Sequence, residues 1–238
     1  MYSIRRGADR GTADFGWLKA KHTFSFGQYR DPNYMGFSIL RVINDDIIAG
    51  NSGFSTHSHD NMEILTFIHK GEISHEDSEG NKASIVPGEI QIMSAGSGIS
   101  HSEMNNKDDE INLFQIWIEP NIRDTKPGYQ QKSYSAFKCT GGVRLLASEN
   151  GEDGSLLIKA DAKVYLADLK NKEKLNFEFS ENRAYWVQMI EGKLNFEFTA
   201  KSVSIEQRDA IALLKQSEIK AVCEPDAKFL IFDLPAKI

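Results

Sequence analysis

Short apolar runs alternate with polar turns along the whole chain. The runs recur about every 8–12 residues and are separated by Gly, Asn, Asp and Pro, a spacing typical of a β-sandwich or barrel. Turn residues lie between them at Lys70-Gly71, Glu79-Gly80-Asn81, Pro87-Gly88 and Glu191-Gly192. We therefore predict an all-β protein with only short helical stretches. The predicted strands are Gly36–Val42, Met62–His69, Ile90–Met93, Asn112–Glu119, Lys163–Leu169, Ala184–Ile190, Ala210–Leu214 and Phe229–Leu234.

The two halves of the chain repeat one order of elements. Met62–Ile73, a PGEIQIM segment and Phe114–Pro120 follow one another in the first half. Asn182–Phe196, a QRDAIALL segment and Phe229–Pro235 follow in the second half, about 115–121 residues later. Such repetition indicates a duplicated unit, and chance similarity between β-rich segments is the alternative.

A polar segment separates the two repeats. Asn121–Gln131 contains Pro127-Gly128 and follows a strong strand, so we interpret it as an inter-domain connection. We expect a first domain over residues 1–132 and a second over residues 133–238.

Composition and net charge exclude some classes of function. The 238 residues are 40% hydrophobic and 26% charged, which is ordinary for a globular protein. The net charge of −6 and the absence of a Lys/Arg cluster argue against direct nucleic-acid binding. No apolar run reaches the roughly 20 residues of a membrane span, and the N-terminus lacks the apolar core of a signal peptide, so we expect a cytoplasmic protein. The two cysteines form no paired motif and indicate structural thiols.

Two short motifs bring together residues that bind metals. His57 and His59 are two positions apart, as are His101 and Glu103. Side chains at i and i+2 of a strand point the same way, so each pair aims its two side chains at one point. Three imidazoles and one carboxylate suit iron, zinc, nickel, manganese or copper, and an octahedral ion would keep two positions open. The alternative is that each pair is a polar surface element.

The remaining histidines and one glutamate have more than one possible role. Glu63 has the same parity as the first histidine pair and is a candidate partner of a ligating histidine, an alternative ligand or a catalytic base. His69 and His75 flank a turn and are expected at the surface. His22 is expected to be structural, with a pocket lining as the alternative. The expected core residues, some of which could border a pocket, are Phe24, Phe26, Phe67, Met93, Phe114 and Trp117.

The second half contains no histidine. The repeat offset places Phe177, Phe179, Ile219 and Ala221 where the first half has its ligand candidates. We therefore expect a second barrel whose centre is filled by side chains and which holds no comparable metal.

At these motifs the chain resembles the pirin family of bicupins. The resemblance runs from about Phe15 to Pro120. It is carried by HTFSFG (His22–Gly27), DPNYMGF (Asp31–Phe37), LRVINDD (Leu40–Asp46), THSHDNMEILT (Thr56–Thr66), MSAGSGISHSE (Met93–Glu103) and FQIWIEP (Phe114–Pro120).

The resemblance implies a fold, a metal and an activity. The fold is two double-stranded β-helix (jelly-roll-like) cupin barrels face to face. The metal is one divalent transition ion, usually Fe(II), with Zn, Ni, Mn, Co or Cu as alternatives, held by His57, His59, His101 and Glu103. The activity is that of quercetin 2,3-dioxygenases, which open a flavonol ring with O2 and release carbon monoxide. For such a reaction we expect Glu103 or Glu63 to accept the substrate proton, and Glu63 is the more testable candidate because a ligating carboxylate is a weaker base. A non-enzymatic metal- or redox-sensing regulator that binds protein partners is the alternative.

Overall fold

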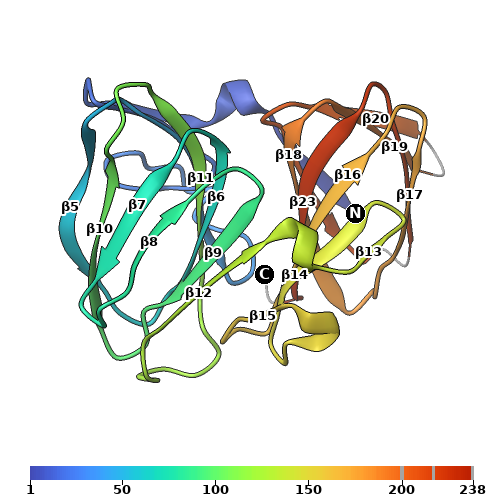
Figure 1. The fold of residues 1–238 in the computed structure, drawn as a ribbon. Coiled ribbons are helices and arrows are strands. Elements are labelled where there is room, and N and C mark those ends of the chain that lie inside the picture. Colours follow the sequence, from blue (N-terminus) through green and yellow to red (C-terminus); the bar gives the residue numbers. More distant parts are fainter. Residues whose placement is uncertain (199–200, 216–217, 237–238) are drawn as a thin grey trace.

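The protein is built of two β-barrels that lie side by side (Figure 1). The computed structural model describes residues 1–198, 201–215 and 218–236, and for Asn176, Glu218 and Ile219 it describes the backbone only. No α-helix occurs in these ranges; the helical turns are the 3-10 segments η1 (Gly7–Asp9), η2 (Tyr134–Ala136) and η3 (Glu152–Gly154). The all-β, two-barrel fold expected from the sequence is confirmed.

The first barrel is formed by two antiparallel sheets. In the described chain the larger sheet has the strand order β12-β9-β6-β11-β4-β3-β2, and the smaller has the order β5-β10-β7-β8. The strands are β2 (Gly11–Asp14), β3 (Leu18–His22), β4 (Leu40–Ile48), β5 (Ser52–His59), β6 (Glu63–Lys70), β7 (Ile73–Asp77), β8 (Lys82–Ile85), β9 (Glu89–Ser94), β10 (Ile99–Asn105), β11 (Ile111–Ile118) and β12 (Gly128–Ser133).

The second barrel repeats this plan. Its larger sheet has the order β1-β21-β18-β23-β16-β14-β13, with β15 beside β14, and its smaller sheet has the order β17-β22-β19-β20. The strands are β1 (Tyr2–Arg5), β13 (Cys139–Thr140), β14 (Val143–Ser148), β15 (Leu156–Leu157), β16 (Lys163–Leu169), β17 (Lys174–Glu178), β18 (Arg183–Glu191), β19 (Lys193–Phe198), β20 (Lys201–Glu206), β21 (Ala210–Leu214), β22 (Glu218–Cys223) and β23 (Ala227–Pro235).

The two larger sheets share one apolar core. Alternation along β6 sends Leu65 and Phe67 into a buried cluster that also contains Trp186 and Phe232 of the second barrel. The ring of Phe24 lies 5.0 Å from the ring of Trp186, so the contact between the barrels is direct. Burial of this apolar and aromatic surface stabilises the contact between the barrels.

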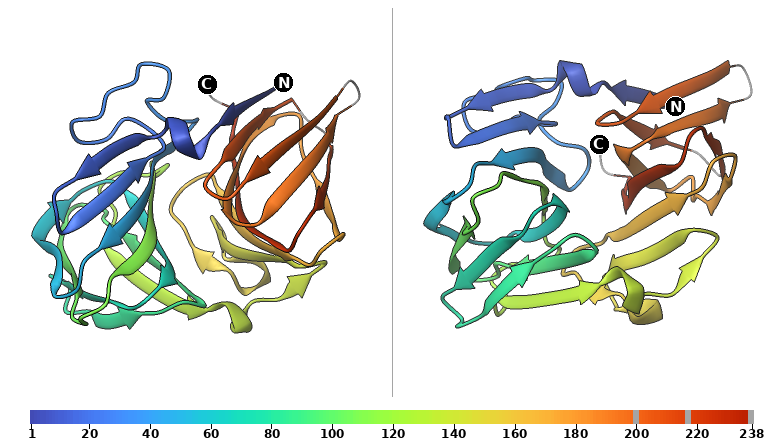
Figure 2. Two further views of the ribbon diagram at one scale, coloured as in Figure 1. Left: turned by 90° about the horizontal axis from the view of Figure 1, so that it is seen from above. Right: turned by 45° about the horizontal axis from the view of Figure 1, so that its top comes forward.

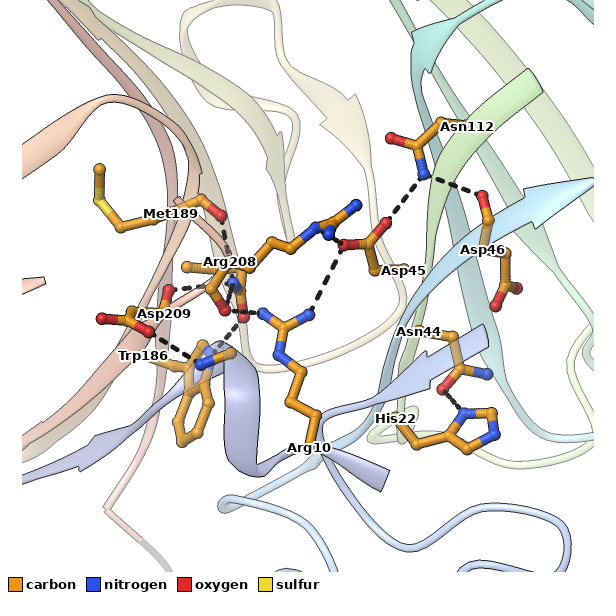
Figure 3. A network of polar contacts seen from close by, with 12 residues as sticks. Arg10, His22, Asn44, Asp45, Asp46, Asn112, Trp186, Met189, Arg208 and Asp209 are labelled. Atoms are coloured by element: carbon orange, nitrogen blue, oxygen red, sulfur yellow. Dashed lines mark hydrogen bonds and ion pairs between the residues drawn. The ribbon is translucent and has the colours of Figure 1, made fainter. Parts of the chain in front are cut away.

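The N-terminal segment ties the barrels together as well. Strand β1 pairs with β21 of the second barrel before the chain enters β2 of the first (Figure 2). Beyond β1, the Arg10 guanidinium donates to the backbone carbonyl of Arg208, and Arg208 Nε lies 3.0 Å from Asp45 Oδ2 on β4 (Figure 3). The expected division at residue 132 stays a prediction.

Most predicted strands are present, with two corrections. The prediction of a strand at Gly36–Val42 is wrong at its start, because Phe37 and Leu40 close a turn around Ser38, whose φ is 54°. The strand runs instead over Leu40–Ile48 and includes the polar residues Asn44, Asp45 and Asp46, whose hydropathy is typical of a loop. The expected connection Asn121–Gln131 is also wrong at its end, since Gly128–Gln131 belong to β12 and pair with β9.

Membrane insertion through a helix has no support. None of the helical segments in the described ranges has the length and apolar character needed to cross a bilayer.

Candidate metal centre

Strands β5 and β10 pair so that three histidines converge. His57 is the register partner of His101, and His59 lies two positions further along β5. The ring centroids of His57 and His101 are 4.5 Å apart, and those of His59 and His101 are 5.0 Å apart. The ligand atoms of the three imidazoles all lie within 4.8 Å of one another. The i, i+2 pattern thus brings the histidines to one point.

The nitrogens of this cluster fit a metal. Within the described residues, both ring nitrogens of His101 and the Nε2 of His59 are buried and have no hydrogen-bond partner. His57 Nδ1 contacts the Ser55 carbonyl oxygen at 2.8 Å, which leaves its Nε2 free to face the others. Buried polar atoms are normally paired, so these atoms call for a ligand. A soft or borderline divalent cation matches an imidazole set of this kind.

The electrostatics keep the imidazoles neutral. Burial, and to a lesser extent nearby His57, lowers the pKa of His59 to about 4. Burial and the neighbouring histidines lower the pKa of His101 to about 3. A neutral imidazole has the lone pair that coordination requires, so no proton has to leave these two rings near neutral pH.

Glu103 lies two positions after His101 on β10, and hydrogen bonds fix its carboxyl group. A register shift in the pairing of β10 with β5 falls between His101 and Glu103, and Glu103 is only 1% exposed. Its carboxyl accepts hydrogen bonds from Gln115 Nε2 at 3.0 Å and from Thr66 Oγ1 at 3.4 Å. Burial raises its pKa to about 7, against the lowering effect of these two bonds. Thr66 and Gln115 are not among the predicted site residues, because they come from strands of the other sheet and local pattern does not connect them to Glu103.

Glu63 is not brought to the histidines. Its Oε2 accepts from Ser94 Oγ at 2.8 Å and from the backbone N–H of Lys159 at 3.1 Å. On β6 it shares parity with Leu65, which faces the second barrel, whereas Thr66 faces the interior of the first. The parity argument from His57 does not extend to Glu63, because residues 60–62 turn the chain into a different sheet.

His75 is buried, so its expected surface position is wrong. It is 2% exposed, and its Nε2 lies 3.1 Å from Asp77 Oδ2. Its ligand atom lies within 4.8 Å of those of His101 and Glu103. The alternation of buried Ile73, His75 and Asp77 along β7 is the pattern that points to this position.

A cavity of about 480 Å³ opens next to the cluster, within the usual size range of ligand pockets. Its walls include His57 and His59, and the ring of Trp117 packs on His59 at a centroid distance of 5.0 Å. Phe26, expected in the core, lies 5.4 Å from the Trp117 ring and also lines the cavity. The cavity is also lined by His22, Asn44, Asp46, Phe54 and Gln115.

The second barrel is filled at the corresponding place. Phe179 is 6% exposed and Ala221 is 1% exposed, and both belong to an apolar cluster inside the barrel, which Phe177 borders. The side chain of Ile219 lies outside the described residues. The expectation that side chains fill this centre is confirmed by the cluster.

Two fused β-barrels, with a histidine cluster beside a pocket in the first, define a bicupin with a candidate metal centre. A family model described as Pirin matches residues 5–118, and one described as the quercetinase C-terminal cupin domain matches residues 145–234. The quercetin 2,3-dioxygenase of Escherichia coli K12 is 41% identical over 236 residues, which is 99% of each chain. The chain belongs to the pirin family.

Solved structures agree with this assignment. The crystal structure of YhhW from Escherichia coli superposes with a TM-score of 0.93 at 40% identity, covering 99% of this chain and 98% of that one. A second structure, of bacterial pirin YhhW from Escherichia coli in complex with nickel(II), gives a TM-score of 0.92 at 39% identity and covers 99% of both chains. The pirin-like protein YhaK of Escherichia coli K12 is 31% identical over 99% of this chain and 100% of its own length.

Proposed function

We propose that this chain is a metal-dependent dioxygenase of the quercetin 2,3-dioxygenase type, which opens a flavonol ring with O2. The observation that carries the proposal is the set of three imidazoles with unpartnered nitrogens beside a cavity with aromatic walls. Relatives named quercetin 2,3-dioxygenase that match along almost the whole chain support the same reaction.

The proposed ligands are His57, His59, His101 and Glu103. The carboxylate offsets part of the charge of a dication in a buried site. We propose Fe(II) as the working metal, and the nickel(II) complex of a relative supports a site that accepts several first-row ions. When bound, such a cation would act as a Lewis acid and lower the pKa of a substrate hydroxyl.

The side chains around the cavity would orient the substrate and provide an apolar surface for it. Trp117 and Phe26 meet edge to face at an interplanar angle of 87°, and both line the cavity, so a planar aromatic ligand finds apolar surface there. Ser55 fixes the ring of His57 through its carbonyl oxygen. These contacts hold the imidazoles and the substrate in place before reaction, which lowers the entropic cost of reaching the reactive geometry.

Glu103 is the proposed proton acceptor. Before a metal binds, burial raises the pKa of this carboxyl to about 7, so its carboxylate is a better base than that of an exposed glutamate. Its ligand oxygen lies within 4.8 Å of the ligand nitrogens of His75 and His101. Glu63 is bonded elsewhere and is not used in this scheme.

The test is turnover by protein loaded with Fe(II) without air and then given quercetin and O2. We expect O2 uptake and carbon monoxide release in equal amounts. His101→Ala is expected to lose both the metal and the turnover. His69→Ala is the matched control, since His69 packs on Phe114 outside the cluster and should leave both intact. Full turnover in His101→Ala would contradict a metal-centred reaction.

The regulatory alternative and the cytoplasmic location stay predictions. Metal-loaded protein that consumes no flavonol would favour a protein-binding role over the enzyme.

A further inference from the structure

One wall of the cavity beside the histidines is polar. His22 on β3, Asn44 on β4 and Gln115 on β11 are register partners across three neighbouring strands. Asp46 lies two positions beyond Asn44 on β4, so its side chain points to the same face. All four side chains line the cavity that His57 and His59 also line.

Three of the four polar side chains have side-chain partners. His22 Nδ1 and Asn44 Oδ1 lie 2.8 Å apart, and Gln115 holds Glu103. Figure 3 shows Asp46 on the side of His22 and Asn44, whereas Asp45 points to the arginines between the barrels. Asp46 is 3% exposed, and within the described residues its Oδ1 has no hydrogen-bond partner.

An unpaired buried carboxyl oxygen costs free energy. Leaving such an atom without a partner costs about 1–3 kcal/mol, so a native fold that keeps one at a pocket wall indicates a role for it. Burial raises the pKa of Asp46 to about 8, and the nearby carboxyls of Asp45 and Glu103 add to the rise. The group is therefore mostly a neutral acid at pH 7, and it avoids repelling an anionic ligand.

A hydroxyl group is the ligand chemistry that fits this oxygen. A hydroxyl both donates and accepts, so it pairs with the carboxyl in either protonation state. The rings of Phe26, Phe54 and Trp117 line the same cavity, as do the histidines. We infer that Asp46 binds a ring hydroxyl of a polyhydroxylated aromatic substrate and thereby sets the orientation of that substrate beside the histidine cluster. The inference rests on the proposed function and names a specificity residue for it.

The experiment measures binding without turnover. Metal-loaded protein under nitrogen is titrated with quercetin and with flavonols that each lack one ring hydroxyl, and Kd is read from tryptophan fluorescence. The variants are Asp46→Leu, which removes the hydrogen-bonding group at similar size, and Asp46→Asn, which retains one. Asp168→Asn is the control, since it removes a surface carboxyl of the second barrel. Thermal unfolding of each variant reports on its fold.

The wild type is expected to bind one of the analogues at least about 10-fold more weakly than quercetin. Asp46→Leu should bind quercetin more weakly than the wild type by a similar factor, so that its Kd for quercetin equals its Kd for that analogue. Its relative affinities for the other analogues should stay unchanged. Asp46→Asn should keep part of the preference, and the control should keep all of it. A purely structural Asp46 would weaken every ligand alike, so an unchanged preference in Asp46→Leu overturns the inference. Wild-type protein that binds no flavonol at all overturns the proposed function, and the inference with it.

Discussion

The hydrogen bonds that Gln115 donates to Glu103 are expected to strengthen metal binding at the candidate metal centre. Gln115 Nε2 lies 3.0 Å and 3.3 Å from the two oxygens of Glu103, in a site where that carboxyl is 1% exposed. The change Gln115→Leu removes this donor at similar volume. Thr66 then remains as the hydroxyl donor, at the longer distance of 3.4 Å.

Two consequences follow from the loss of this donor. The carboxylate form loses a stabilising bond, so the pKa of Glu103 should rise further above its ordinary value, and protons compete better with the metal. Outer partners of metal ligands are typically worth about 10–100-fold in metal affinity. We therefore expect Gln115→Leu to weaken metal binding by about 1.4–2.8 kcal/mol at pH 7, with a smaller loss at pH 8.5.

The assay is competition between the protein and a chromophoric chelator for Co(II) or Ni(II), at pH 7 and pH 8.5. Gln188→Leu is the matched control, because Gln188 is also fully buried and its Nε2 donates to the carbonyl oxygens of Met189 and Asp209 in the second barrel. It should lower stability and leave metal affinity unchanged. Equal metal affinity in Gln115→Leu and wild type, or an equal loss in the control, would refute the reasoning.

Three further predictions concern stability. The pKa of His101 is lowered to about 3 in the fold, so the unfolded chain binds more protons below pH 6.5, and the His101 contribution to the stability of metal-free protein should fall from there down to about pH 3. In thermal unfolding, His101→Leu should show a flatter pH dependence than wild type, and an equally steep fall contradicts this. Trp186→Ala removes a buried ring that joins the barrels and should cost about 3–5 kcal/mol in denaturant unfolding; a loss below about 1 kcal/mol would mean that the barrels do not depend on it. Gly192 has a φ of 78°, and a Cβ there would meet a backbone oxygen at 1.9 Å, so Gly192→Ala should cost several times more than Gly80→Ala, where φ is 88° and the space is open. Similar losses of unfolding free energy in the two glycine variants would contradict the steric argument.

The histidine pairs show how far local pattern reaches. His57 and His59, and likewise His101 and Glu103, are paired by alternation within one strand, and the sequence displays that alternation directly. His75 follows the same rule on β7, since it lies two positions after the apolar and buried Ile73. Closeness to the turn at Lys70-Gly71 does not expose His75, because β7 already begins at Ile73.

Glu63 and Asp46 show where local pattern ends. Parity holds only within one strand, and the turn before β6 moves Glu63 into another sheet that faces the second barrel. Asp46 lies in a polar stretch that does not look like a strand, yet β4 carries it into the barrel interior. A polar lining gives a strand the composition of a loop, so hydropathy alone misplaces it.

The strand-rich architecture, the duplicated order of elements and the convergence of three histidines follow from spacing within short segments, so the sequence predicts them. The side chains that support Glu103, the polar wall of the cavity and the crossing of β1 to the second barrel depend on the folded arrangement of distant strands. The physical reason is that these contacts join strands far apart in the chain, and their partners are set by sheet register and barrel closure, which no local run of residues encodes.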